Sequence, residues 1–499
     1  MANQCLAGCI ADYECGPLHT PGPAGEQGES FAPWVKVEII AGQSITVGNE
    51  SYSADKNTAI VKSFEVGWID TPTAIIEVVD EAGGQMGALV NAINKCAKAV
   101  EITSIVKFQF GWIVTDCNGN KKTVSSYPFE LTLLKIEVSY AEGKVKYKLT
   151  GNHAGVITDH LREDFLIGTD DKRVPLEEAI REIYSKDPAI NVRFCKQDES
   201  GKLIDTKFKW KNFQEGGPKE VWQADNQARD AVVRKWIDPF RIDDGTIWGK
   251  GIKLIDDNRS VNTKILLVDP SPNPGEGMSN CGGSLGTFIV NGGKCSSVIE
   301  FSPTFNWISG VTNFSAGGGT NGPGGTENTF SEDYAVENAS KDHGPTAGLQ
   351  TQTGMTQQSW SAYGPKYAYS ETMRSQMAHL KGATVESGIS AELRILGDPR
   401  PPFCEPGMLS RNVSIVAINP FHIQKSINKG CGDWLAIPGC NQILSNKNWR
   451  VEGINHSIKE GSYTTTLKLK LDAPGIDQGK DEPVGKQGSG GPTVKNNCK

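Results

Sequence analysis

Runs of alternating or β-branched residues, bounded by turn-forming residues, recur along most of the 499-residue chain. Alternation with a period of two puts successive side chains on opposite faces, which is the pattern of a half-buried strand. Between residues 34 and 155 such runs include VKVEII, AIVKSFEVGWI and ITSIVKFQFGWIV, with turns at Asn118-Gly119 and Glu142-Gly143. QMGALVNAINKCAKAV predicts one helix among them. We therefore expect residues 34–155 to form one β-barrel or sandwich with a single helix.

The rest of the chain divides by composition and periodicity. Residues 156–244 contain amphipathic segments such as LEEAIREIY and predict a small α/β domain. Residues 245–475 form a second β-rich segment, with an exposed Gly-, Ser- and Thr-rich insertion at about 311–362. Residues 1–33 are interpreted as an extended, cysteine-containing arm, and residues 476–499 as a disordered tail.

Charge and hydropathy limit the classes of partner. No run approaches the roughly 20 apolar residues that span a bilayer, and the N-terminus lacks the order of a signal peptide, so membrane embedding and general export are not expected. The formal charge of -7, with mixed signs, predicts no basic face for tight binding of nucleic acid. An acidic surface would instead let a nucleic acid slide past.

Twelve cysteines are scattered through the sequence without a CxxC pair. Cys431 and Cys440 bracket a short loop and could form a disulfide in an oxidising setting such as a released particle. Buried free thiols are the favoured interpretation. Zinc binding by the three N-terminal cysteines (Cys5, Cys9 and Cys15) is disfavoured because only His19 lies near them, and no metal or other cofactor is expected.

The motifs of catalysis are missing from the sequence. There is no complete phosphate loop, no HExxH and no GxSxG, so the chain is not expected to be an enzyme. Glu163-Asp164 and Asp256-Asp257 are interpreted as solvated faces. His456 shares a strand face with apolar neighbours and is interpreted as a hydrogen-bonded core or interface histidine. The aromatic residues Trp434, Trp449 and Tyr463 are predicted to fill a core, with a sugar-binding platform as the alternative.

Four stretches near the C-terminus resemble one family. Residues 449–458 (WRVEGINHSI) and 461–472 (GSYTTTLKLKLD) predict a hairpin followed by a long strand. They resemble the closing segment of the baseplate hub proteins of contractile-tailed bacteriophages, the tail hub or late control protein D-like family. Residues 391–399 and 413–421 are similar to paired strands of that family that end in a Gly-Asp-Pro and an Asn-Pro turn. The residues that carry these motifs are Gly397, Asp398, Pro399, Asn419, Pro420, Trp449, Gly453, His456, Gly461, Tyr463 and Thr465.

The resemblance covers about residues 380–475 and is only architectural over 34–310. It implies a mainly β fold with a small α/β domain and two tube-like β-barrels per chain, over 34–155 and 245–475. Three chains would form a homotrimeric, pseudo-six-fold ring. The implied partners are the tail tube or its initiator protein, the central spike, and baseplate wedge or other hub proteins. DNA would pass through the ring transiently, and the location would be the baseplate of the virion tail, assembled in the host cytoplasm.

Three other functions remain open from the sequence. A spike or hub protein of a related secretion or contractile injection system shares this architecture, but normally continues into a β-helical needle. A tail-associated cell-wall hydrolase would require catalytic motifs that the sequence lacks. A carbohydrate-binding adhesin would use the 311–362 insertion or the aromatic strands.

Overall fold

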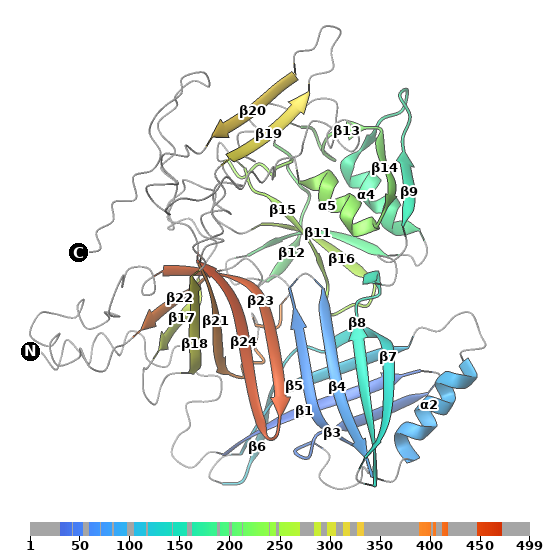
Figure 1. The fold of residues 1–499 in the computed structure, drawn as a ribbon, viewed down its shortest axis with the longest axis vertical. Coiled ribbons are helices and arrows are strands. Elements are labelled where there is room, and N and C mark those ends of the chain that lie inside the picture. The colour runs from blue at the N-terminus through green and yellow to red at the C-terminus, as the bar shows by residue number, and fades with distance from the viewer. Residues whose placement is uncertain are drawn as a thin grey trace, which may run out of the picture.

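A computed structural model of the chain is mainly β, with short helices. It describes residues 30–41, 43–52, 59–69, 71–81, 84–96, 104–115, 118–141, 143–156, 162–186, 190–198, 202–211, 213–238, 240–245, 249–269, 284–290, 297–305, 313–319, 327–333, 389–400, 403–405, 412–417 and 447–471. The predicted fold class is confirmed in its β content and in one closed barrel. Figure 1 shows the small α/β unit above this barrel and a second sheet beside it.

The first barrel closes through strand pairing. Its strands are β1 (Ser30–Ile40), β2 (Ser44–Gly48), β3 (Ala59–Trp68), β4 (Pro72–Asp80), β5 (Ile105–Thr115), β7 (Phe129–Ala141) and β8 (Lys144–Asn152). They follow the order β3-β2-β1-β5-β7-β8-β4, and pairing of β3 with β4 completes the ring. Residues 30–33, predicted to belong to the arm, instead begin β1. Their backbone continues the antiparallel ladder with β5.

Local sequence signals explain the turns and the helix of the barrel. Strand β6 (Lys121–Ser125) follows β5 through the predicted hairpin, where Gly119 has a φ of 81°. Gly143, with a φ of 72°, turns the chain between β7 and β8. Only glycine adopts such angles without a steric penalty. The predicted helix is α2 (Gly84–Cys96), and Asp80 Oδ2 accepts the Met86 N–H of its first turn at 3.0 Å.

The small α/β unit has its own core and includes two strands beyond its predicted boundary. Its strands are β9 (Glu163–Ile167), β10 (Val174–Pro175), β11 (Asn191–Gln197), β12 (Leu203–Asp205), β13 (Lys219–Glu220), β14 (Trp222–Gln227), β15 (Ile252–Asp256) and β16 (Thr263–Val268), and its helices are α4 (Leu176–Ser185) and α5 (Arg229–Ile237). β16 pairs in parallel with β11 and antiparallel with β15. Residues 252–268, predicted to belong to the second barrel, therefore complete this sheet instead.

The second β-rich segment forms a sheet that joins the barrel. It contains β17 (Ser284–Val290), β18 (Val298–Phe305), β21 (Ile389–Leu396), β22 (Asn412–Ala417), β23 (Lys447–Lys459) and β24 (Ser462–Leu471). The strand order is β17-β22-β23-β24-β21-β18, and β17 also contacts β18. No ladder between described strands closes this sheet, so the predicted second barrel is observed only as an open sheet. Inside the 311–362 insertion, β19 (Asn313–Gly319) and β20 (Glu327–Asp333) form an antiparallel pair.

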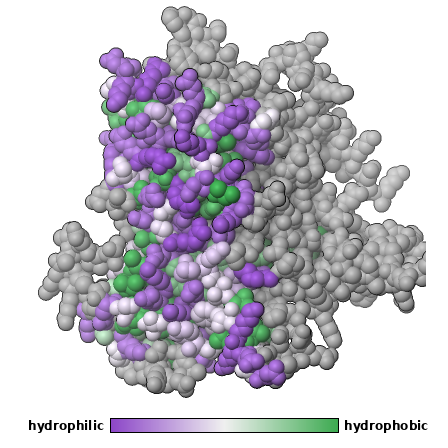
Figure 2. Space-filling model, turned by 180° about the vertical axis from the view of Figure 1, so that it is seen from behind, coloured by the Kyte–Doolittle hydropathy of each residue, from purple (hydrophilic) through white to green (hydrophobic). Residues whose placement is uncertain are grey.

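Strand β23 connects the two β regions. Its second half pairs with β3, from Ile454 opposite Trp68 to Lys459 opposite Ser63. The barrel and the second sheet thereby share one 14-stranded sheet and one hydrophobic core. Viewed from behind, the described surface is mostly hydrophilic, with small hydrophobic patches between (Figure 2). No helix in the described ranges has the length and apolar character to cross a bilayer.

Candidate functional site: the motif joint

The hairpin of β23 and β24 carries most of the motif residues. Its two-residue turn consists of Glu460 and Gly461, with φ values of 51° and 75°. Two positive φ angles define a turn whose twist matches that of the flanking strands, so the hairpin register is fixed locally. Gly453 lies where the β23–β24 register shifts, and its φ is not positive. A positive φ, the conformation that favours glycine, is thus found at Gly461 and not at Gly453.

His456, on β23, is completely buried where this hairpin meets the barrel strand β3. Its Nε2 is 3.1 Å from the Phe403 carbonyl oxygen, which can only accept, so Nε2 carries the proton and donates. Its Nδ1 therefore accepts, and it lies 3.0 Å from Tyr463 Oη and 2.9 Å from Thr465 Oγ1. Burial lowers the pKa of His456 to about 4, against a smaller opposing effect of the Phe403 carbonyl. The imidazole is therefore neutral near pH 7, with both nitrogens engaged.

The Gly-Asp-Pro turn packs directly on this hairpin. The Gly397 N–H donates to the Tyr463 carbonyl at 2.9 Å, and the Asp398 N–H donates to Thr465 Oγ1 at 3.0 Å. A Cβ on Gly397 would lie 2.2 Å from the Tyr463 ring, so only glycine fits at this approach. Pro399 accepts a hydrogen bond from the Cys404 thiol at 3.1 Å.

The Asp398 carboxylate is buried and forms a fork with Arg400. Arg400 Nε donates to Oδ1 at 2.9 Å and Nη2 donates to Oδ2 at 2.7 Å. Burial raises the pKa of Asp398 above its ordinary value, and the Arg400 guanidinium opposes that rise. The two hydrogen bonds stabilise the turn, and they engage both oxygens of the buried carboxylate.

Aromatic side chains of the barrel complete the motif joint. Trp112 Nε1 donates to the Gly397 carbonyl at 2.7 Å, and its ring lies 5.3 Å from that of Tyr463. The His456 ring lies 4.9 Å from Phe110 and 5.6 Å from Trp68. Contacts of this kind add specific geometry to apolar burial. We define the motif joint by Gly397, Asp398, His456, Tyr463, Thr465 and Trp112.

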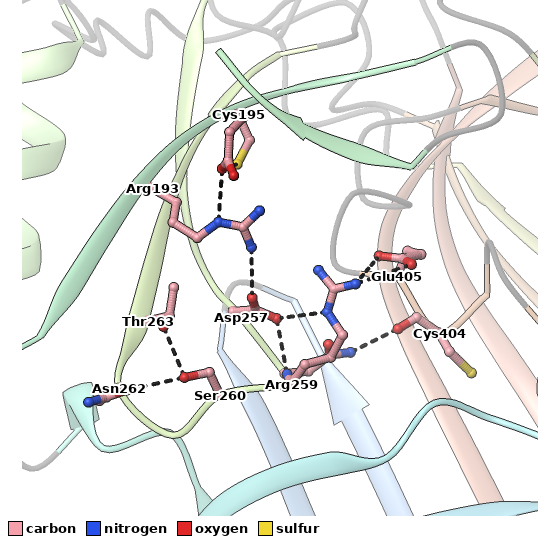
Figure 3. A network of polar contacts seen from close by, with 11 residues as sticks. Arg193, Cys195, Asp257, Arg259, Ser260, Asn262, Thr263, Cys404 and Glu405 are labelled. Atoms are coloured by element: carbon pink, nitrogen blue, oxygen red, sulfur yellow. Dashed lines mark hydrogen bonds and ion pairs between the residues drawn. The ribbon is translucent and has the colours of Figure 1, made fainter. Parts of the chain in front are cut away.

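A second polar cluster links the α/β unit to residues 403–405, the segment whose Phe403 carbonyl contacts His456 (Figure 3). We call this cluster, which contains Arg193, Asp257, Arg259 and Glu405, the Asp257 network. Asp257 accepts from Arg193 Nη1 at 3.3 Å and from Arg259 Nε at 3.2 Å. Arg259 also approaches Glu405 Oε2 at 3.3 Å, and burial raises the pKa of Glu405 despite this cation. Within the same turn, Asn258 donates to the Cys404 carbonyl at 2.9 Å and accepts from the Glu130 N–H of the barrel at 3.0 Å.

The Asp257 network corrects one prediction from the sequence. Asp256 and Asp257 are both buried at 4% exposure, not solvated. Asp256 lies beside Lys264 of β16, and Asp257 lies beside Arg193 of β11 and Arg259 of its own turn. Two cysteines near the network, Cys195 and Cys404, are buried free thiols. Burial raises the pKa of Cys195 to about 12 and also raises that of Cys404, so both are protonated and unreactive.

The remaining predicted residues fall into two cases. Trp449 is buried, but it packs against Phe301 at 5.6 Å on another part of the sheet. Asn419, Pro420, Cys431 and Cys440 lie outside the described residues. The sequence did not identify Arg400, Arg259 or Trp112, although the short spacing of Asp398 and Arg400 is a usable signal for an ion pair.

Chemically, the motif joint is suited to holding elements together. Both nitrogens of the buried His456 imidazole are engaged by groups of the protein itself, and the Asp398 carboxylate is engaged by Arg400. No group of three or more metal-ligating side chains occurs in the ranges that the structure describes.

Comparison with known proteins gives distant similarities. No protein-family model and no curated protein sequence matches the chain. The tail protein from Neisseria meningitidis MC58 aligns over 88% of this chain and 98% of its own, with 8% identity and a TM-score of 0.47. The 43 kDa tail protein of prophage MuSo2 from Shewanella oneidensis aligns over 87% and 97%, with 10% identity and a TM-score of 0.45. A Francisella PdpA-VgrG complex aligns over 91% of this chain and 53% of that chain, with 9% identity and a TM-score of 0.40.

Proposed function

We propose that the chain is a structural hub subunit of a contractile phage tail, matching the hexameric tail tube to the trimeric central spike. The observation that carries the proposal is the motif joint. Motifs at 397–399 and 456–465, which resemble those of the hub family, meet in one buried network that fixes the second sheet onto the barrel. Such a network stabilises one relative arrangement of two β regions, as force transmission through a ring requires.

The proposal includes a homotrimer with two β regions in each chain, so that the six regions of the trimer imitate the six subunits of a tube ring. Its partners would be the tail tube or its initiator, the spike, and wedge or other hub proteins, with DNA passing through. The location would be the virion baseplate, after assembly in the host cytoplasm. The proposal assigns no catalysis, and zymography on peptidoglycan tests that part separately.

Native mass spectrometry of the 53.9 kDa chain tests the hub role directly. We expect a species of three chains, stable alone or once tube or spike protein is added, and rings in negative-stain images. A chain that stays monomeric with both partners present would overturn the proposal. Trimers that bind a β-helical needle but no tube protein would favour a secretion-system spike instead.

A further inference from the structure

A third polar cluster, separate from the motif joint, lies inside the α/β unit. Lys264 on β16 has a side chain with 0% exposure, and its Nζ lies 2.7 Å from Asp230 Oδ2 on α5. The same Nζ lies 2.7 Å from Asp256 Oδ1 on β15. The two carboxylates have side-chain exposures of 12% and 2%. One amine is therefore held against two carboxyl groups where little water reaches.

The two carboxylates have different surroundings. Asp230 Oδ1 accepts a hydrogen bond from Tyr184 Oη at 2.5 Å, which polarises its carboxyl carbon. Asp256 contacts the Lys264 amine as an ion pair, and no hydrogen bond comparable to that from Tyr184 reaches either of its oxygens. His153 Nδ1 lies 3.4 Å from Asp256 Oδ1. Asp256 is thus placed to exchange protons with the amine, whereas Asp230 is held and activated.

Space around the amine is kept open by a glycine. A Cβ on Gly155 would lie 2.5 Å from Lys264 Nζ and 2.5 Å from its Cε. Any other residue would displace the lysine from the two carboxylates. Reacting groups held in contact inside a dry site react as if their effective concentration were about 10⁵ M or more.

We propose that Lys264 and Asp230 condense spontaneously into an intramolecular amide, an isopeptide cross-link between β16 and α5. The Lys264 ammonium passes one proton to Asp230 Oδ2, which makes that carboxyl group neutral, and the resulting amine attacks the Asp230 carboxyl carbon while Asp256 takes a second proton from the nitrogen. Tyr184 donates to the oxygen that becomes negative. Asp256 then returns the proton to the departing oxygen. The N–C bond forms, one C–O bond breaks, and two hydrogens of the ammonium leave with that oxygen as water.

The resting state and the product can be told apart by mass alone. Burial raises the pKa of Asp230, but the Lys264 charge and the hydrogen bonds from Lys264 and Tyr184 lower it overall, so the ion pair precedes the reaction. No oxidant, reductant or other reactant is consumed. The inference is independent of the proposed hub role and holds or fails without it.

Intact-mass measurement of the denatured full chain tests the cross-link, both freshly purified and after several days at room temperature. We expect a mass lower than the sequence mass by one water. Tryptic digestion should show peptide 230–234 joined to a peptide in which Lys264 stays uncleaved. Lys264→Arg, which keeps the positive charge, and Asp256→Asn should both show the full sequence mass.

Folded wild-type protein that keeps the full mass, with peptide 260–264 released normally, would overturn the proposal. A water loss that maps to any other pair of residues would do the same. A cross-link that persists in Asp256→Asn would remove Asp256 from the proton-transfer step. Because these readouts concern the wild-type chain first, a variant that fails to fold does not decide the outcome.

Discussion

Gly397→Ala is the sharpest perturbation of the motif joint. The added Cβ would lie 2.2 to 2.4 Å from three Tyr463 ring atoms, and real Cβ atoms do not approach that closely. The ring is fully buried against Trp112, so it cannot turn away without moving the barrel wall. The Tyr463 hydroxyl would then lose its 3.0 Å contact with His456 Nδ1.

The magnitude follows from two effects. Overpacking a buried site costs about 1–3 kcal/mol, and loss of one buried hydrogen bond adds about 1 kcal/mol. We therefore expect Gly397→Ala to lower the free energy of unfolding by roughly 2–4 kcal/mol. The assay is urea unfolding followed by tryptophan fluorescence, to which Trp112 of the joint contributes.

Gly87→Ala provides a matched control with the same chemical change. A Cβ on Gly87, inside α2, meets nothing within 4 Å, so this variant should gain about 0.5–1 kcal/mol from lower helix entropy cost. If Gly397→Ala unfolded at the wild-type midpoint while Gly87→Ala shifted as expected, the described packing of Tyr463 on Gly397 would be refuted.

Three further predictions concern the same region. Burial holds the His456 pKa at about 4, so the contribution of the neutral imidazole to the free energy of unfolding should be fully present above pH 6.5. That free energy should fall by roughly 3 kcal/mol as the pH drops towards 4, because only the unfolded chain takes up the proton readily. His456→Gln should flatten that part of the pH profile of unfolding. Gly461→Val should cost about 1–2 kcal/mol in thermal unfolding because its φ is 75°, and since a Cβ there meets nothing within 4 Å the loss reports backbone strain. A wild-type melting temperature would contradict the turn geometry. Arg259→Met should lower the free energy of unfolding by about 2 kcal/mol and increase hydrogen exchange at 257–263, because it leaves the Glu405 carboxylate without its cation. Adding Glu405→Gln should restore part of the loss. Unchanged stability and exchange would show that this ion pair does not stabilise the segment.

Local features were predictable from the sequence because their causes are local. Alternation located the barrel strands, and glycine-containing turns located the hairpins at Gly119, Gly143 and Gly461. The buried, hydrogen-bonded state of His456 followed from the apolar residues on its strand face.

Features that depend on distant partners were not predictable. β16 was assigned to the wrong unit because its parallel neighbour β11 lies far back in the chain. The burial of Asp257 depends on Arg193, supplied by β11. Closure of the second sheet could not be deduced, since alternation fixes which face of a strand is buried but not whether the last strands meet.

The sharing of β3 has a consequence for biosynthesis. One edge of β3 pairs with β4. Along its other edge β2 pairs only at Ile60, near the start of β3, so the stretch from Ser63 to Trp68 pairs on that edge with β23. That stretch leaves the ribosome long before residues 454–459 are translated. During this interval the nascent barrel exposes an open strand edge, which other chains can join. Slow translation or premature termination upstream of β23 should therefore produce aggregates rather than a soluble half-protein.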